Sequence, residues 1–353
     1  MAQSPGQLPR IPLSERQTFL NFLLNKSSSF RQWPETASVF QRAPLLGTLA
    51  LLLALGACGR TINRPTQSTT STATPAPSTP TPILANWDLI WSDEFDAPDG
   101  LGVDTSKWTL ADTAAWVNEE LEYYTPRLKN VYIENPTGKN GVLAIKAFRE
   151  DYELREFTSG KLTTLGKFEQ LYGRFEARIQ IPFGQGLWPA FWMLGATGGW
   201  PFGGEIDIME NIGKEPNLIH GTMHGPGYSG ARGIGGPFSL LAGQRFADDF
   251  HLFAIEWEPN VIRWYVDNQL YKTNTPADLP PGAPWVYDHS FYLILNVAVG
   301  GSWPGNPDDT TVFPQTMKVD YVRVYIRPGG WPASTATQVD FTATPATITV
   351  PKP

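Results

Sequence analysis

Cysteine is nearly absent from this sequence of 353 residues, in which Cys58 is the only one. No disulfide can form within the chain, so its stability must come from packing or from a bound metal. Charged residues are also few, at 17%, and the 27 basic and 34 acidic side chains leave a net charge of −7 without a basic run. This balance argues against nucleic acid or an anionic membrane as the partner and favours a neutral ligand.

Long apolar runs are missing as well. Residues 43–57 are apolar over about 15 positions, which is short for a membrane span and suits the core of a signal peptide. Arg42 precedes this run and small residues lead into Cys58, a pattern that resembles the lipobox of bacterial lipoproteins. We predict that residues 1–58 are an N-terminal extension and lipoprotein-type signal peptide, with the true start near Val39. The mature protein is then expected at the cell surface, lipid-anchored to the outer side of a bacterial membrane.

No window of useful length repeats its apolar residues with the 3.6-residue period of a helix. Short β-rich runs separated by Gly, Pro, Asn and Asp recur instead, at residues 87–92, 141–147, 173–181, 253–258 and 261–267. We therefore predict an all-β fold, a jelly-roll sandwich of two curved antiparallel sheets. Its concave face would form a cleft for an extended polymer.

Low-complexity sequence surrounds this β-rich region. Residues 61–82 are nearly all Ser, Thr, Pro and Ala, and the tail from Gly329 is similar, so both have too little apolar surface to offset the entropy of ordering. We predict a linker over residues 59–85, one folded domain over residues 86–328 and a disordered tail over residues 329–353. The domain holds eleven of the 13 tryptophans, which fill cores or offer flat faces to sugar rings.

Three acids stand close together in the run Gly-Glu-Ile-Asp-Ile-Met-Glu-Asn. Glu205 and Asp207 share a strand face by the period of two, whereas Glu210 faces the other side unless a β-bulge near Met209 restores the parity. Crowding of three carboxylates raises the proton affinity of some of them. One acid can then stay protonated beside an ionised neighbour, as glycoside hydrolysis by two carboxyl groups requires.

Further sequence blocks flank this run in a fixed order. They are residues 91–96, 118–125, 166–168, 172–179, 186–195, 204–210, 220–225, 295–305 and 317–325. In this order they resemble glycoside hydrolase family 16, and within it the bacterial laminarinase-like branch, over nearly all of the predicted domain. The bulged spacing of the acids also resembles that branch rather than the one with strictly alternating acids.

The resemblance implies a β-jelly roll and hydrolysis of internal β-1,3-glucosidic bonds in laminarin-type glucans, with net retention of configuration. It implies Glu205 as nucleophile, Glu210 as acid/base and Asp207 as the residue that assists the nucleophile by hydrogen bonding. No cofactor is expected for catalysis. The expected partner is a β-1,3-glucan bound by a monomer.

Aromatic residues in loops are candidates for sugar binding. Trp188, Trp200 and Trp303 each lie among Gly and Pro, where a ring can be held at the surface to stack on a pyranose. Core packing is the alternative for all three. Stacking is least expected for Trp192, which follows a hydrophobic run.

Polar residues complete the predicted cleft. Gly221 and Thr222 lie between His220 and His224 in a β-rich setting, so the two histidines belong to a strand rather than to a helical zinc pair. By resemblance His224 reaches the catalytic site, while His220 has a structural role at least as readily. The resemblance also implies that Asn118, Arg174 and Asn296 donate hydrogen bonds to sugar hydroxyls. For Arg174 the alternative is the solvated side of its strand, where a row of charged residues usually lies.

A structural calcium ion is a further implication of the resemblance. Its ligands would be Glu94, the carbonyl of Gly141 and Asp320, and oxygen ligands of this kind suit calcium. Ordinary surface acids are the alternative. Other activities also stay open at this point: a mixed-linkage glucanase, an agarase, a carrageenase, or a non-catalytic β-glucan-binding module, which has no need of crowded carboxylates.

Overall fold

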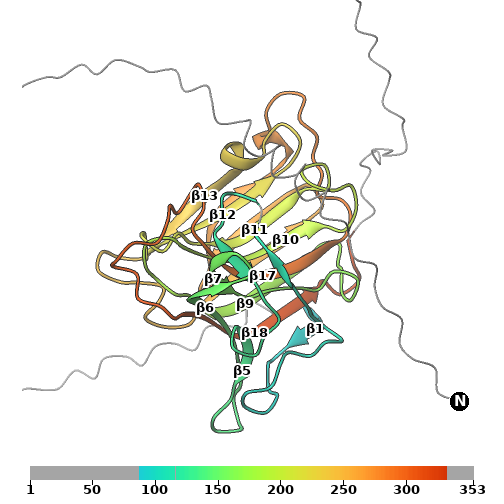
Figure 1. Cartoon of the computed structure of the whole chain (residues 1–353). Helices are drawn as coiled ribbons and strands as arrows, with labels where there is room; N and C mark the ends of the chain where they lie inside the picture. The colour runs from blue at the N-terminus through green and yellow to red at the C-terminus, as the bar shows by residue number, and fades with distance from the viewer. Residues whose placement is uncertain (1–86, 116, 332–353) are drawn as a thin grey trace, which may run out of the picture. The chain divides into compact units, whose positions relative to one another are not determined.

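A computed structural model describes residues 87–115 and 117–331, which consist mainly of β-strands and loops (Figure 1). Two short 3-10 turns, η1 (Gly230–Arg232) and η2 (Pro276–Asp278), are the helical elements of this part. The all-β prediction is confirmed. No helix among the described residues is long and apolar enough to cross a membrane. The predicted signal peptide, Cys58 and the linker lie outside the described residues.

The strands form two sheets with antiparallel pairing throughout, apart from one parallel pair. The larger sheet has 11 strands: β1 (Asp88–Asp93), β3 (Thr113–Ala114), β4 (Glu122–Tyr124), β5 (Val131–Glu134), β6 (Val142–Tyr152), β7 (Arg155–Ser159), β9 (Gly173–Gln180), β14 (His251–Glu258), β15 (Val261–Val266), β16 (Gln269–Asn274) and β18 (Gln315–Ile326). Its order is β16-β15-β14-β9-β18-β6-β7-β4-β3, with β1 paired to β18 and β5 to β6.

The smaller sheet has seven strands, one of which carries the acidic triplet. They are β2 (Thr109–Leu110), β8 (Lys161–Thr163), β10 (Leu187–Gly195), β11 (Glu205–Glu210), β12 (Leu218–His224), β13 (Ile234–Ser239) and β17 (Phe291–Val299). The order is β13-β12-β11-β10-β17-β8-β2, so the triplet strand lies near the middle.

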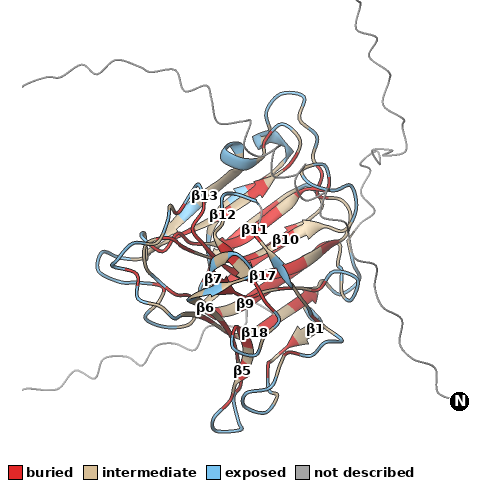
Figure 2. Cartoon of the chain, in the orientation of Figure 1, coloured by how far each residue is buried: buried red, intermediate tan, exposed pale blue. Residues whose placement is uncertain are grey.

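The hydrophobic core lies between the two sheets, as the red inner segments of the strands show (Figure 2). Alternate residues of β9 and β14, such as Phe175 and Ile255, face this core from the larger sheet. Phe191 and Met193 of β10 face it from the smaller sheet. Period-two alternation therefore sends one set of side chains into the core and leaves the intervening set for the outer faces.

One hydrogen bond crosses the core to the triplet strand. Trp264 of β15 is fully buried, and its Nε1 donates to the carbonyl oxygen of Asp207 on β11 over 2.8 Å. Gly221 of β12 leaves room for the indole, because a Cβ at this position would lie 2.4 Å from Cδ1 of Trp264. The larger sheet thus holds the backbone on which the acids stand.

The folded part extends further than the predicted boundary at residue 328. The ring of Trp331, which the sequence assigned to the tail, lies 6.2 Å from that of Trp87 and 6.2 Å from that of Tyr172. The guanidinium of Arg327 lies over both tryptophan rings. Contacts between the two ends of the described chain account for the difference. The sequence alone does not predict these contacts.

We expect Trp264→Phe to lower the free energy of unfolding by about 1–3 kcal/mol, because it leaves the buried carbonyl of Asp207 without its donor. Urea denaturation followed by fluorescence measures the change. Trp285→Phe is the matched control, since its Nε1 is buried and has no partner among the described residues. An equal or larger loss in the control would contradict this role of Trp264.

Candidate active site

A β-bulge in β11 brings the three acids to one cleft. Between Asp207 and Glu210 the pairing with β12 shifts by one residue. Ile208 and Met209, which lie within the shift, are 1% and 0% exposed and both pack in the core. The bulge predicted near Met209 is confirmed, and the carboxylates of Glu205, Asp207 and Glu210 line the same cleft.

Each acid of the triplet contacts one nitrogen of an aromatic or imidazole ring. The contacts join Trp200 Nε1 to Glu205 Oε2 (2.5 Å), Trp188 Nε1 to Glu210 Oε1 (3.0 Å) and His224 Nε2 to Asp207 Oδ2 (3.1 Å). Three of the residues selected from the sequence as sugar-binding candidates therefore lie directly against the triplet. The two indoles act as donors, which favours the ionised form of each glutamate.

Burial opposes ionisation of all three acids. It raises the pKa of Glu205 to about 8, with a further contribution from the charge of Asp207, and raises the pKa of Asp207 to about 7. Burial and the charges of Asp207 and Glu205 raise the pKa of Glu210 well above its ordinary value. Because the buried carboxylate of Asp207 and the half-buried carboxylates of Glu205 and Glu210 repel one another, the triplet retains at least one proton near neutral pH.

A chain of hydrogen bonds extends the cleft away from the triplet. Trp192 donates from Nε1 to Asn296 Oδ1 (2.7 Å), and Asn296 donates from Nδ2 to the hydroxyl of Tyr124 (3.2 Å). That hydroxyl donates to Glu120 Oε2 (3.1 Å), and Asn118 donates from Nδ2 to Glu120 Oε1 (3.2 Å). The predicted cleft residues Asn118 and Asn296 are thus placed beside the triplet, in one continuous lining.

Trp303 stands at the rim, next to the triplet. Its ring meets the ring of Trp188 edge-on at 5.4 Å and the ring of His220 at 5.0 Å, and it remains 36% exposed. His220 pairs with Glu210 across β11 and β12. His220 therefore supports the aromatic rim, as the structural alternative from the sequence required, and both histidines lie on a strand.

Arg174 corrects a prediction from the sequence. It is 1% exposed and belongs to β9 of the larger sheet, where it bonds to Glu176 (2.9 Å), Glu256 (3.2 Å) and Asn268 (3.1 Å). Its neighbour Phe175 faces the core, so Arg174 points to the opposite side of that sheet. A buried guanidinium with three protein partners is not available to a sugar in the cleft.

The residues suggested for calcium are engaged in other contacts. Glu94 accepts two hydrogen bonds from Arg323, at 3.0 and 2.7 Å, and Asp320 accepts one from Arg178 at 2.8 Å. Gly141 directly precedes β6. Two arginines beside these carboxylates oppose a cation, so the arrangement does not favour a calcium ion. The calcium site stays a prediction from the resemblance alone.

Comparison with known proteins places the fold and cleft in a family. A family model for glycosyl hydrolases family 16 matches residues 129–323. A beta-glucanase of Rhodothermus marinus is 44% identical over 256 residues, which cover 68% of this chain and 85% of that protein. The chain belongs to glycosyl hydrolases family 16.

Other members of family 16 agree with this assignment. A glucan endo-1,3-beta-glucosidase A1 of Niallia circulans is 40% identical over 273 residues, covering 70% of this chain and 39% of that longer protein. The X-ray structure of an endo-beta-1,3-glucanase from Pyrococcus furiosus matches with a TM-score of 0.64 at 48% identity. That match covers 69% of this chain and 96% of the other.

The family-16 cleft also contains Tyr124 and Lys161, which the sequence did not single out. Trp192, the tryptophan for which stacking was least expected, lines the cleft together with them. Period two within the block of residues 118–125 is a signal that groups Tyr124 with Glu120 on one strand face. Lys161 offers no such signal, because its strand β8 has three residues and pairs with β17, far along the chain.

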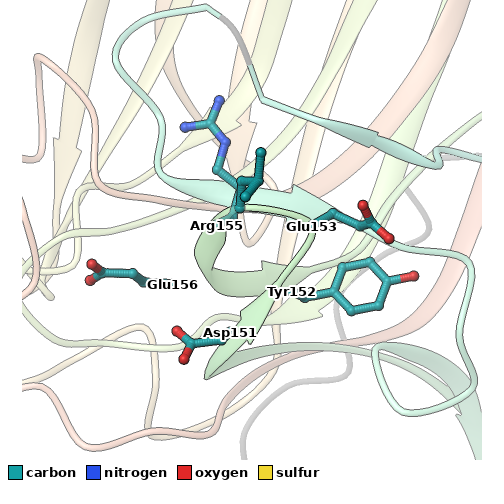
Figure 3. Close-up of a pocket in the computed structure, with 6 residues that line it drawn as sticks. Asp151, Tyr152, Glu153, Arg155 and Glu156 are labelled. Carbon is teal, nitrogen blue, oxygen red and sulfur yellow. The ribbon is translucent and has the colours of Figure 1, made fainter. Parts of the chain in front are cut away.

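A second hollow lies at the turn between β6 and β7, lined by Asp151, Tyr152, Glu153, Leu154, Arg155 and Glu156. The side chains of Tyr152 and Glu153 extend to one side of this turn, those of Asp151 and Glu156 to the other, and Arg155 in a third direction (Figure 3). Leu154 is fully exposed at its tip. Because one turn supplies the whole lining and no polar groups converge there, this hollow lacks the features of a ligand site.

We expect Asp207→Asn to lower the pKa of both Glu205 and Glu210, because the charge of Asp207 raises both. Carbon-13 NMR titration of labelled glutamate carboxyl groups measures the shifts. Asp248→Asn, an exposed change paired with Arg245, is the control and should move neither pKa. Unchanged pKa values in Asp207→Asn would show that burial alone sets them.

Proposed function

We propose that this family-16 protein hydrolyses internal β-1,3-glucosidic bonds of laminarin-type β-glucans with retention of configuration. The observation that carries the proposal is the bulged strand β11, which turns Glu205 and Glu210 into one cleft on either side of Asp207. Retaining hydrolysis needs two carboxyl groups on the same bond, one as nucleophile and one as proton donor. The names of the matched relatives support β-1,3-glucan as substrate.

In the proposed mechanism, ionised Glu205 attacks the anomeric carbon while protonated Glu210 gives its proton to the glycosidic oxygen, and the bond between that carbon and oxygen breaks. Water then attacks the glycosyl ester, passes its proton to Glu210 and releases Glu205. A carboxylate oxygen of Asp207 lies within 4.8 Å of one of Glu205, where it can orient the carboxyl group of the nucleophile. The two carboxyl groups supply both nucleophile and proton, so the reaction needs no cofactor.

Substrate contacts in this proposal follow the aromatic residues of the cleft. The exposed rings of Trp200 and Trp303 lie against Glu205 and Trp188, where they can stack on sugars next to the cleaved bond. One acid–histidine cluster of the described chain, Glu205 with Asp207 and His224, has ligand atoms within 4.8 Å of one another. The direct contact between His224 and Asp207 accounts for their proximity without a metal.

The location of the protein is part of the proposal. The apolar run before Cys58 supports a lipid-anchored enzyme on the outer side of a bacterial membrane, acting as a monomer on an extracellular polysaccharide. A glucan polymer is too large to enter a cell, so an external enzyme would meet its substrate directly.

Glu205→Gln should abolish cleavage of laminarin and of a nitrophenyl laminari-oligosaccharide alike, because both need the nucleophile. Glu210→Gln should slow laminarin cleavage about 100- to 10,000-fold but spare release of nitrophenol, a leaving group that needs little help from an acid. Reducing-sugar and nitrophenol assays measure the two rates. Glu153→Gln, an exposed change at the β6–β7 turn, is expected to keep wild-type rates.

Wild-type activity of Glu205→Gln on laminarin would contradict the nucleophile assignment. Faster cleavage of lichenan or agarose than of laminarin by the wild-type enzyme would replace the substrate with a mixed-linkage glucan or agar. Binding of laminarin without cleavage of any polysaccharide would make the protein a glucan-binding module.

Two indole changes should move opposite limbs of the pH profile of kcat/KM. Trp200→Phe removes a donor to Glu205 and raises its pKa, so the acid limb, where Glu205 must ionise, moves to higher pH. Trp188→Phe raises the pKa of Glu210, so the alkaline limb, where Glu210 loses its proton, moves to higher pH. Trp303→Phe touches neither carboxylate and should weaken binding without moving either limb. Movement of the same limb by both changes would contradict the two roles.

A further inference from the structure

Among the described residues that line the cleft, Lys161 is the one lysine, so its side chain supplies the one ammonium group there. Its Nζ lies 4.9 Å from the ring centre of Trp192 and 5.6 Å from that of Tyr124. At these distances a cation is attracted to the face of an aromatic ring. The two rings therefore hold the ammonium at the surface of the cleft.

Within the described part of the chain, this ammonium has no hydrogen bond and no ion pair in addition to its two ring contacts. The polar groups around it are hydrogen-bonded to one another in a chain that runs from Trp192 through Asn296 and Tyr124 to Glu120. An ammonium carries three donors and no acceptor. Its donors thus remain available to a ligand in the cleft.

The charges around Lys161 define the ligand that it can bind. Glu120, Glu122 and Glu205 attract the ammonium and oppose the effect of burial, which lowers the pKa of Lys161. Carboxylates outnumber this cation along the cleft, so an anionic ligand is repelled. A neutral ligand rich in acceptor oxygens, such as a chain of unmodified sugars, suits both the free donors and the surrounding charge.

The register of the smaller sheet locates Lys161 relative to the cleaved bond. Lys161 pairs with Asn296 on β17, Asn296 with Ala190 on β10, and Ala190 with Glu210 on β11. Three strand spacings of about 4.8 Å separate the backbone of Lys161 from that of Glu210 by about 14 Å. Its side chain reaches back toward Trp192, so it meets a sugar beside the reacting one.

We propose that Lys161 is a substrate-binding residue, whose ammonium donates hydrogen bonds to hydroxyl oxygens of a glucosyl unit next to the one that is cleaved. The carboxylates around it favour a neutral glucan chain over a sulfated one. This inference rests on the proposed glucanase function and adds a residue to its binding surface.

The test compares the wild-type enzyme with Lys161→Met and Lys161→Arg on β-1,3-gluco-oligosaccharides of increasing length. Lys161→Met should raise KM about 10- to 100-fold on the longer substrates, the loss expected for a charged hydrogen bond, while kcat changes little. Lys161→Arg should recover most of the binding, and Lys139→Met, an exposed change of equal charge, should match the wild type.

A loss of kcat that is equal at all lengths, with unchanged KM, would overturn the inference, because Lys161 would then act on the carboxylates and not on a sugar. Wild-type KM values in Lys161→Met at every length would overturn it too. Equal affinity of the wild type for sulfated and neutral laminarin would refute the charge selection. Failure of the wild type to cleave any oligosaccharide would instead refute the glucanase function itself, and thermal unfolding of each variant verifies that it is folded.

Discussion

The one-residue bulge in β11 is the constraint on which the rest of the site depends. A regular strand would place Glu205 and Glu210 on opposite faces, with one of them in the core. Ile208 and Met209 are instead both buried, and their burial on the core side offsets the ladder bonds that a bulge forfeits. The indole of Trp264 bonds to the carbonyl of Asp207 at the start of the bulge. Core packing thus fixes the spacing of groups that act on the outer face.

Three neighbouring acids repel one another when ionised, and the aromatic residues around them stabilise the ionised form of some of them and not of others. Burial raises the pKa of every member, and mutual repulsion adds to this. The indoles of Trp200 and Trp188 each stabilise the ionised form of one glutamate. A nucleophile and an acid of identical chemical type are therefore distinguished by their surroundings rather than by their own structure.

Much of this arrangement is readable from the sequence, since the runs that form β9, β14 and β15 alternate clearly. Alternation groups side chains by face, however, without saying which face of which sheet they occupy. Arg174 was wrongly assigned to the cleft from the family resemblance, and alternation could not correct this because it does not show that the row belongs to the larger sheet. Trp192 was obscured differently: Phe191 and Met193 face the core beside it, so the whole run is apolar although one face lines a cleft. The position of Lys161 in the cleft depends on the pairing of β8 with β17, which the sequence alone does not predict.

The two sheets also differ in how their charged side chains are paired, and this difference distinguishes the face that carries the site. On the larger sheet, arginines neutralise carboxylates directly, as Arg174 does for Glu176 and Arg323 does for Glu94. The described lining of the cleft contains carboxylates and aromatic rings with a single lysine among them. Unpaired polar groups in a partly buried site are costly unless a ligand completes their hydrogen bonds. A polyhydroxylated chain that completes these hydrogen bonds therefore removes this cost, and the removal favours its binding.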